Sequence, residues 1–411
     1  MHNFSLMNLL LYFFRGRFAV FCLCVVFTNC SGKIDSTTTS AIIPIPIDLE
    51  QYTTIEAADF WAAAEAIALE LGPESAMEQI RKITKTNHFL VIHHVLDRTN
   101  EQSIMIFDHV GKFYKKIIAN QEGPGNFSYM KDFFMRNDTL MEIVDNIQQK
   151  TFLYNTEGTF LEDVTLGAAA ARFVPLDAHF YLLYRGNAVQ FDELQITDNL
   201  LLIDATSKKM QSFVPIQDAL ADNLFNVSNH FFPDINENTF LFCDIANDTI
   251  YECTKRGVQP RYVLQFSNKQ MQQRALTKLA DEKAKKSQDY SLALLEWANN
   301  QEIIKAPELI VAREDMLFFW FRYKGQHHVF RYNKKSGEGQ LFRLNNIRLW
   351  PLWYAGEDEL LMVVGAPVVQ RDALQQQAYP TPTQVRAVFE EVNENSNPII
   401  IRVNTSTLFS K

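Results

Sequence analysis

Cysteine is scarce in this sequence, and its distribution limits what the residue can do. Five cysteines occur in 411 residues, and three of them, Cys22, Cys24 and Cys30, fall in the first thirty positions. A disulfide-rich scaffold is therefore excluded, and the lack of a Cys-x-x-Cys motif after residue 30 excludes a zinc site of that type. Cys243 and Cys253 flank a short segment. They could form one disulfide bond, or they could be two buried thiols in neighbouring strands.

Catalytic motifs are equally scarce. The chain has no Gly-x-Ser-x-Gly elbow, no Walker-type phosphate loop, no His-Glu-x-x-His and no EF-hand loop. Positive charge is in deficit too, with 39 Lys and Arg against 48 Asp and Glu and a net charge of −9. Because an acidic chain repels a phosphate backbone, we expect no nucleic-acid partner.

The apolar run near the N-terminus, "FAVFCLCVVF", is short. A membrane-spanning helix needs roughly 20 apolar residues, whereas this run after Arg15 and Arg17 has the length of a signal-peptide core. We predict a signal peptide at residues 1–29, with Cys30 as the lipidated first residue of the mature chain. Ordinary secretion and an uncleaved anchor are the alternatives. The Ser/Thr-rich residues 30–41 are predicted to be a flexible tether, so the membrane contact would be through the lipid alone.

A strand–turn–strand pattern recurs along the rest of the chain. The first four copies begin near residues 104, 151, 200 and 249, a spacing of 47 to 49 residues. A fifth copy begins at 328 and a last one lies at the C-terminus, in "IIIRVNTSTLFSK". The two longer gaps hold segments of different composition: we predict a helical insertion at residues 267–301 and a loop with a short helix at residues 370–397.

An apolar strand precedes each of these hairpins, and a further short strand precedes most of them. Four strands in about 48 residues, repeated six times, predict an all-β fold, a six-bladed β-propeller spanning residues 42–411. A two-domain β-sandwich is the alternative, but it gives no reason for the constant period. Residues 41–80 are less clear. "IIPIPIDL" favours an edge strand because of its prolines, whereas "AIALEL" could be helical or could supply the outermost strand of the last blade.

The most specific segments of the repeat are "IMIFDHVGKFYKKI", followed by "EGPGNF", and "NDTIYECTKRGVQPRYVLQF". On these segments the chain resembles the family of six-bladed β-propeller lipoproteins of Gram-negative gut-type bacteria, which are similar in shape to NHL-repeat propellers. The resemblance implies a propeller fold and a lipid-anchored place in the cell envelope, facing the periplasm or the cell surface, but no reaction. Asn126 and Phe127 stand where the family typically has Glu and Tyr, so a carboxylate role at that corner is absent.

Acidic residues follow the second strand of successive repeats, and this placement predicts a ring of carboxylates at one mouth of the central channel. These channel-mouth candidates are Asp97, Asp145, Asp192 and Asp244. A carboxylate ring could bind a divalent cation, and a close pair could act as acid and base on a sugar. The alternative is structural, because turns favour Asp. The histidine pairs at 93–94 and 327–328 offer a further, weaker metal hypothesis.

Aromatic residues gather in the last third of the chain. We predict a ligand-binding region there, with stacking side chains and the helical insertion beside them. Its members are Trp320, Tyr323, Trp350, Trp353 and Tyr354. The alternative is that these rings fill the core between blades.

Two functions are compatible with this sequence. The first is an envelope-anchored binding or scaffold module for a glycan, a peptide or an envelope protein, with no catalytic residues and no cofactor. The second is a propeller hydrolase or lyase that uses channel carboxylates or a metal on a carbohydrate or lactone. The missing catalytic motifs favour the first.

Overall fold

The computed structural model describes residues 41–409, apart from 97–98, 120–122, 124, 189–195, 224–230, 237, 286–288, 346–351, 355, 357, 366–382 and 394. Side chains at 352–354 and 383–384 are also not described. The predicted signal peptide, the tether and Cys30 therefore lie outside the described residues. Residues 41–411 form one compact unit.

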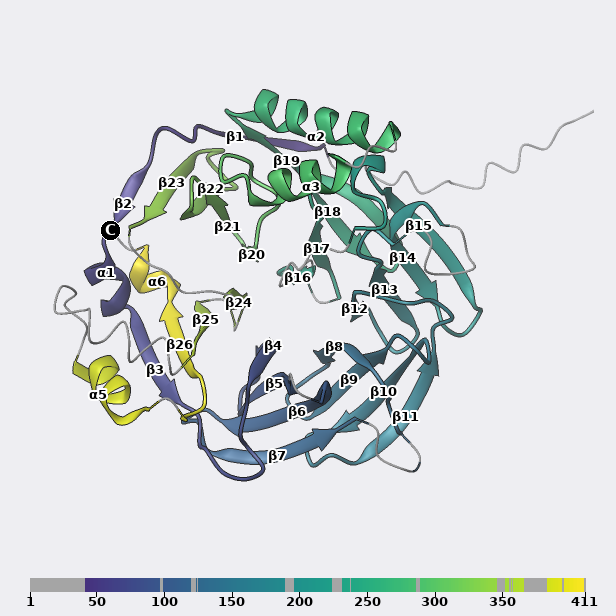
Figure 1. The fold of residues 1–411 in the computed structure, drawn as a ribbon, viewed down its shortest axis with the longest axis vertical. Coiled ribbons are helices and arrows are strands. Elements are labelled where there is room, and N and C mark those ends of the chain that lie inside the picture. Colours follow the sequence, from purple (N-terminus) through teal and green to yellow (C-terminus); the bar gives the residue numbers. More distant parts are fainter. Residues whose placement is uncertain are drawn as a thin grey trace, which may run out of the picture. The chain divides into compact units, whose positions relative to one another are not determined.

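Six β-sheets are arranged around a central axis as the blades of a propeller (Figure 1). The first three blades have four strands each, in sequence order from the axis outward. Blade 1 contains β4 (Gln79–Lys85), β5 (Phe89–Leu96), β6 (Glu101–Asp108) and β7 (Phe113–Ile118). Blade 2 contains β8 (Met130–Met135), β9 (Leu140–Asp145), β10 (Lys150–Asn155) and β11 (Phe160–Thr165). Blade 3 contains β12 (Arg172–Pro175), β13 (Phe180–Tyr184), β14 (Asp198–Asp204) and β15 (Lys209–Pro215).

The other three blades each gain an outer strand from the N-terminal part of the unit. Blade 4 contains β16 (Phe231–Pro233), β17 (Phe240–Cys243), β18 (Thr249–Thr254), β19 (Gly257–Phe266) and β1 (Ile43–Ile47). Blade 5 contains β20 (Leu309–Ala312), β21 (Met316–Tyr323), β22 (Gln326–Asn333), β23 (Gly339–Leu344) and β2 (Thr53–Ile55). Blade 6 contains β24 (Leu352–Tyr354), β25 (Glu359–Val364), β26 (Ile399–Asn404) and β3 (Ala64–Ala68). The predicted six-bladed propeller is confirmed.

Each blade buries both of its faces against its neighbours, which explains why the second and third strands are rich in buried apolar residues. Between blades 1 and 2, for example, Val91 and Ile104 pack with Phe133 and Ile143 in one buried cluster. Each such side chain contributes about 1.5–3 kcal/mol relative to an exposed one. A single blade could not bury these surfaces alone, so the ring must close.

The N-terminal segment closes the ring from outside (Figure 1). Strand β3 pairs antiparallel with β26, with Ile67 opposite Ile400, so the first half of "AIALEL" does lie in the outer strand of blade 6. Strands β1 and β2 add parallel to β19 and β23 as fifth strands. The prolines of β1 are tolerated because an outermost strand needs donors on one side only. Helix α1 (Ala57–Ala62) connects β2 to β3.

The prediction of a sixth hairpin at the C-terminus is wrong. After β26 the chain turns into the short helix α6 (Thr405–Leu408) instead of a second strand. Asn404 caps this helix, since its side-chain oxygen accepts a hydrogen bond of 2.7 Å from the Thr407 amide. The place of the missing strand is taken by β3.

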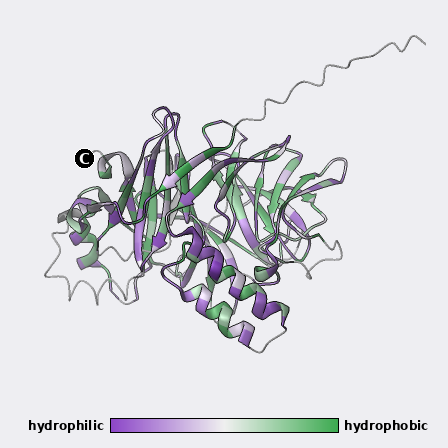
Figure 2. Cartoon of the chain, turned by 90° about the horizontal axis from the view of Figure 1, so that it is seen from above, coloured by the Kyte–Doolittle hydropathy of each residue, from purple (hydrophilic) through white to green (hydrophobic). Residues whose placement is uncertain are grey.

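Two segments depart from the blade pattern. Residues 267–301 hold the helices α2 (Lys269–Ala284) and α3 (Asp289–Asn299). Leu279 and Trp297 are buried between them and the short helix η1 (Asp218–Leu220). Figure 2 shows this helical pair side by side, with many hydrophilic residues on its surface. The second segment is the predicted insertion at residues 370–397. Its described part, residues 383–397 apart from 394, contains helix α5 (Thr383–Glu391). No helix in the described part of the chain is both long and apolar enough to cross a membrane.

Cys243 and Cys253 are not joined by a disulfide bond, and both are buried. They lie in the adjacent strands β17 and β18, where Cys243 pairs with Ile250 and Cys253 with Phe240. Of the two interpretations left open by the sequence, the structure supports two buried thiols.

Gly125, the second glycine of the Gly-Pro-Gly motif, is described, whereas Pro124 lies outside the described residues. Gly125 has a φ of +81°, and its carbonyl oxygen accepts a hydrogen bond from the Tyr154 hydroxyl. A Cβ atom at this position would collide with the Phe160 ring. The glycine is thus required by packing, and no ligand is needed to explain it.

Candidate functional site

A cavity of about 450 Å³ lies at the centre of the ring, among the innermost strands of blades 1 to 4. Strands β4, β8, β12 and β16 supply most of its lining. This volume falls within the range of roughly 300–1,000 Å³ that is usual for small-ligand sites. The innermost strands converge on the axis, so side chains from four different blades face one another there.

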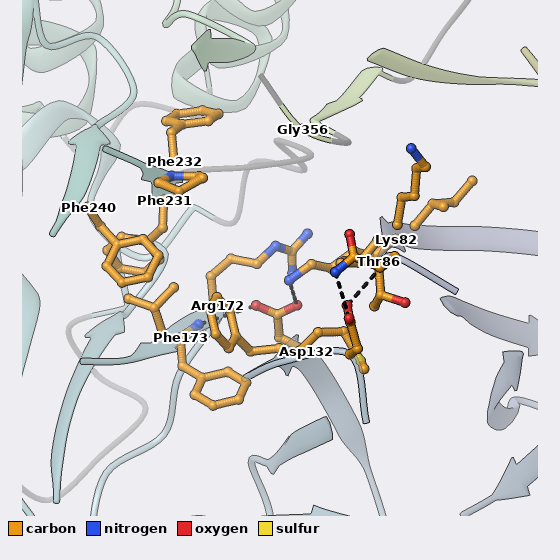
Figure 3. A pocket seen from close by; sticks show the side chains of 18 residues that line it. Lys82, Thr86, Asp132, Arg172, Phe173, Phe231, Phe232, Phe240 and Gly356 are labelled. Atoms are coloured by element: carbon orange, nitrogen blue, oxygen red, sulfur yellow. Dashed lines mark hydrogen bonds and ion pairs between the residues drawn. The ribbon is translucent and has the colours of Figure 1, made fainter. Parts of the chain in front are cut away.

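The strand register brings three charged residues to equivalent positions in consecutive blades. Lys82 pairs with His93, Asp132 with Val144 and Arg172 with Tyr184, in each case in the second strand of the blade. In blades 1 and 2 a β-bulge precedes the charged residue. Bulges re-aim neighbouring side chains. All three residues line the cavity (Figure 3).

Asp132 ties the three blades together. Its Oδ1 atom accepts hydrogen bonds of 2.9 Å from the Lys82 ammonium and 2.9 Å from the Phe133 amide. Its Oδ2 atom accepts a bond of 3.3 Å from the Phe173 amide of blade 3. The Lys82 ammonium also donates to the Phe133 carbonyl oxygen, at 2.6 Å. The carboxylate is buried and accepts these three hydrogen bonds, so it serves to position Lys82.

Positive charge dominates this part of the channel. Burial lowers the pKa of Lys82, and Arg172 lowers it further, although the carboxylate partner of Lys82 opposes the shift. Burial likewise lowers the pKa of Lys131, with contributions from Arg172 and Arg81. The same cations act on His93, whose pKa falls to about 3 chiefly because the ring is buried.

Arg81 and Lys131 owe their place to the β-bulges. Each is the extra residue that the register of its inner strand skips, in β4 and in β8 respectively. The bulges therefore add two cations beside the cavity without breaking the sheets.

The opposite side of the cavity is aromatic. It is formed by phenylalanines from blades 2, 3 and 4, namely Phe134, Phe173, Phe231, Phe232 and Phe240. Figure 3 shows Phe231, Phe232 and Phe240 together on one side, with Asp132 and Lys82 on the other. The rings of Phe134 and Phe240 meet edge to face at 5.8 Å. The cavity thus has a cationic half and an apolar half.

The rim of the cavity is held by further pairs. Lys85 forms an ion pair with Glu359 of blade 6. Asp138 accepts hydrogen bonds from the backbone amide and the side chain of Asn87, at 2.9 and 2.6 Å, which lower the pKa of its carboxyl. Asp132 and Asp138 are the carboxylates among the described lining residues, and both are engaged. The lowered pKa of Asp138 is the opposite of what a general acid requires.

Residues 40–404 match the family model described as "Domain of unknown function (DUF4934)". The chain belongs to the DUF4934 family. No curated protein matches it. Among solved structures, a Bacteroides fragilis protein described as exported is 15% identical, with 89% of this chain and 99% of that chain covered and a TM-score of 0.64. That similarity shows the shared propeller fold.

Two further structures are less similar to this DUF4934 chain. A member of the DUF4221 family from Bacteroides vulgatus is 9% identical over 83% of this chain and 98% of its own, with a TM-score of 0.49. The extracellular domain of a hybrid two-component system from B. thetaiotaomicron is 11% identical over 72% of this chain and 32% of its own, with a TM-score of 0.38.

Asp145, one of the predicted channel-mouth acids, connects two backbone segments of the DUF4934 propeller by hydrogen bonds. Its Oδ2 atom accepts hydrogen bonds from the amides of Ser128 and Tyr129, at 2.6 and 3.0 Å, just before the inner strand of blade 2. Its Oδ1 atom accepts from the amides of Ile147 and Gln148, at 2.7 and 3.0 Å. Burial alone would raise the pKa of Asp145, but these hydrogen bonds outweigh it and lower the pKa.

Asp244 directly follows β17, the second strand of blade 4. Its Oδ2 atom accepts a hydrogen bond of 2.7 Å from the Asn199 side chain, and its Oδ1 atom one of 2.8 Å from the Ile245 amide. Burial raises its pKa to about 6, and these bonds together with one from Tyr184 limit the rise. Neither Asp145 nor Asp244 lines the cavity. The other two predicted acids, Asp97 and Asp192, lie outside the described residues.

The predicted aromatic binding region is only partly described. Trp320 is fully buried and packs against Phe409, with ring centroids 5.7 Å apart. Tyr323 is 6% exposed. Neither ring offers a face to solvent, in keeping with the alternative that they fill the core. Trp350 lies outside the described residues, and of Trp353 and Tyr354 only the backbone, in β24, is described.

The histidine pairs do not meet at the channel. His93 and His94 lie in the second strand of blade 1, and His327 and His328 in the third strand of blade 5, with blade 6 between them in the ring. All four are buried, and the His94 Nε2 atom accepts the Glu78 amide at 2.9 Å. Within the ranges that the structure describes, no three His, Cys, Asp or Glu side chains gather where they could hold a metal ion. A channel cation remains a prediction.

The sequence interpretation missed Lys82, Asp132 and Arg172. A signal was present, since charged residues stand at the start of the segments "RKITK", "KDFFM" and "RFVP", which lie in the inner strands of three blades. Charged residues in apolar strands next to the axis are costly unless they are paired or face a cavity.

Proposed function

We propose that this DUF4934 protein is a non-enzymatic, lipid-anchored binding module of the bacterial cell envelope, and that its ligand binds in the channel cavity. The observation that carries the proposal is the cavity itself, with a polar wall positioned by Asp132 and an aromatic wall opposite. Ligand sites are typically apolar concavities with a few fixed polar groups. The structure supplies both parts from rigid inner strands.

Binding is favoured over catalysis by the state of the carboxylates. Glycoside hydrolysis needs two carboxyl groups with separated pKa values facing one substrate. The two carboxylates of the described lining are instead engaged with Lys82 and Asn87. The carboxylate of Asp145, a predicted channel-mouth acid, accepts hydrogen bonds from backbone amides.

The envelope location rests on the N-terminal sequence and on similarity. Residues 1–29 have the composition of a signal peptide followed by Cys30, and the similar propeller from B. fragilis is described as exported. Cys30→Ala should release the protein from the membrane fraction if a lipid on this cysteine is the anchor. Retention of the variant in the membrane would contradict the lipid anchor but not the binding site.

A thermal unfolding screen tests the binding function. A compound that binds only the folded protein stabilises it, by about 2.7 kcal/mol at a concentration a hundred times its Kd. We expect members of a peptide and glycan panel to raise the melting temperature. Divalent metal salts should leave it unchanged. Thr84→Trp, which adds bulk in the cavity lining, should abolish the shift. Thr165→Trp on the exposed end of β11 is the matched control and should keep it. Shifts with metals alone would contradict the proposal.

A further inference from the structure

We propose that the channel cavity binds an uncharged ligand group in which a bulky apolar side chain stands next to a peptide unit, as at an apolar residue inside a peptide chain. The inference rests on the proposed binding function and names its ligand class. Three observations support it: the balance of charges at the cavity, the hydrogen-bonding groups left over in β4, and the composition of the opposite wall.

The charges at the cavity balance one another. Three cations stand against three carboxylates, namely Lys82, Lys85 and Arg172 against Asp132, Asp138 and Glu359. Lys82 lies 2.9 Å from Asp132, and Lys85 forms its ion pair with Glu359. Asp138 is held by Asn87, and Arg172 has a partner as well. An ionic group of a ligand would therefore lose water without meeting an uncompensated opposite charge.

Two further cations, Arg81 and Lys131, lie just outside the lining. Arg81 is exposed and Lys131 is half-buried. Because water and salt screen exposed charges, the field of these two residues is weaker at the cavity than that of the pairs in its wall. They do not change the preference for an uncharged group.

Strand β4 presents two hydrogen-bonding groups to the cavity that the described part of the protein does not use. The Lys82 ammonium has three N–H donors, and two of them are taken by the Asp132 carboxylate and the Phe133 carbonyl oxygen. The half-buried Thr84 side chain lines the cavity, and its hydroxyl makes no hydrogen bond with the residues that the structure describes. Because Lys82 and Thr84 are two residues apart in one strand, both side chains stand on the same face of it.

A peptide unit complements these two groups. The free N–H of Lys82 donates to a carbonyl oxygen, and the Thr84 hydroxyl accepts from an amide N–H. A peptide unit carries one acceptor and one donor and has no charge, so it satisfies both groups without disturbing the balance of charges.

The opposite wall selects an apolar side chain next to that peptide unit. Phe231 and Phe134 line the cavity and are half-buried, so part of each ring faces its interior. Val174 and Pro233 extend the same surface. These side chains carry no polar atoms, so an apolar group placed against them is stabilised in proportion to the area that it removes from water. Hydroxyl groups of a sugar would instead lose hydrogen bonds with water at this wall.

Phenylalanine offers little to a saccharide beyond its ring face. Tyrosine and tryptophan combine a ring with a hydrogen-bonding group, yet none of the described lining residues is of either type. A volume of about 450 Å³ admits an aromatic side chain with its adjoining peptide units. The wall and the size of the cavity thus favour an apolar residue over a sugar.

Isothermal titration calorimetry of the purified full-length protein tests the class directly. The reference probe is N-acetyl-phenylalaninamide, which has an apolar side chain, peptide units and no charge. N-acetyl-glycinamide lacks the side chain, and N-acetyl-phenylalanine has a charged carboxylate in place of the terminal amide. We expect the reference probe to bind about 10- to 100-fold more tightly than the glycine probe, because the glycine probe buries no ring. It should also bind at least about 10-fold more tightly than the acid.

Either comparison can overturn the class. Equal affinities of the phenylalanine and glycine amides would contradict the apolar side chain. Binding of the acid as tightly as the amide, or more tightly, would contradict an uncharged ligand group. In both cases the cavity would stand as a binding site.

Variants locate the effect in the cavity. Thr84→Val keeps the shape of the side chain but removes its hydroxyl, and it should weaken binding of the reference probe about 3- to 10-fold. Thr165→Val, the same change on the exposed end of β11, is the matched control and should leave the affinity unchanged. Phe231→Ala should lower the affinity for the reference probe towards that for the glycine probe, whereas Tyr114→Ala on the outer strand β7 should not.

Unchanged binding by either cavity variant would overturn the proposal even though the wild-type protein binds the reference probe. Circular dichroism of each variant checks that it is folded. If Phe231→Ala does not fold, Thr84→Val still decides, because it alters no buried apolar contact of the wall.

Two comparisons separate the sources of the ligand and the rival class. An acetylated pentapeptide amide with phenylalanine between glycines should bind more tightly than N-acetyl-phenylalaninamide if the natural ligand is a segment of a peptide chain. Equal or weaker binding would indicate a small molecule, and both results support the class. Tighter binding of cellobiose than of the reference probe, undiminished by Phe231→Ala, would replace the class with a saccharide. If no probe binds while the thermal screen finds a ligand, the class is wrong but the binding function stands. If the screen also fails, both fall.

Discussion

Asp145 offers the sharpest test of the view that the acids after the second strands are structural. The carboxylate is fully buried and accepts hydrogen bonds from four backbone amides, those of Ser128, Tyr129, Ile147 and Gln148. These bonds hold the entry to the inner strand of blade 2 against the turn after β9. Asp145→Ala removes both carboxylate oxygens that accept these hydrogen bonds. The four amides must then bind water or stay without a hydrogen-bond partner.

The expected cost of Asp145→Ala is about 3–5 kcal/mol. Each hydrogen bond to a charged group contributes about 1.5–3 kcal/mol, and a buried donor left without a partner costs a further 1–3 kcal/mol. The total stays below the sum of these values, because amides next to the exposed Ile147 regain water. Asp163→Ala is the matched control: Asp163 is a partly exposed carboxylate in β11, paired with Lys150 at 3.0 Å, and its loss should cost less than about 1 kcal/mol.

Urea unfolding of the variants, followed by circular dichroism, measures both costs. The pH dependence adds a second check. Because hydrogen bonds lower the pKa of Asp145 in the folded state, its stabilisation is present at neutral pH and disappears as the pH falls through that pKa. The deficit of Asp145→Ala should therefore shrink below about pH 4. Equal stabilities of the Asp145 and Asp163 variants, together with loss of ligand binding only in the former, would refute the structural role.

Three further predictions follow from buried or constrained positions. Burial raises the folded-state pKa of Asp244 to about 6, so the protein should lose about 3 kcal/mol of stability as the pH rises from about 4 to 6, and urea midpoints of Asp244→Asn should lack this contribution. Gly111→Ala should destabilise by about 2–5 kcal/mol in the same assay, because its φ is +89° and a Cβ atom would collide with the Ala68 carbonyl of the closing strand. Gly123→Ala, at a φ of +116° with open space around it, should cost less. The thiols of Cys243 and Cys253 should react with a thiol reagent only after unfolding, and rapid modification of native protein would contradict their burial.

The propeller could be predicted because its cause is local and repeated. Hairpins have turn residues such as Gly111, and middle strands such as β5 and β6 of blade 1 bury apolar residues on both faces. The final blade could not be predicted in the same way. "AIALEL" has the composition of a helix, and only pairing with β26, more than 300 residues away, makes it a strand. The error at the sixth hairpin has a small cause, since Asn404 can cap a helix as readily as it can begin a turn.

The candidate site was harder to predict than the fold. Lys82, Asp132 and Arg172 come together only because three inner strands share one register, and two β-bulges set that register. A bulge leaves little trace in a single sequence. The acids were easier to notice, but a turn acid and a channel acid look alike until the backbone amides around them are known, as those around Asp145 show.

The central claim is that a ligand occupies the cavity between the charged inner strands and the phenylalanine wall. A crystal structure of the protein with the strongest ligand from the thermal screen tests this claim most directly. We expect the ligand in the channel, in contact with the charged inner strands on one side and with Phe231 on the other. A ligand bound instead on the outer strands or on the α2–α3 pair, with the cavity unchanged, would contradict the account.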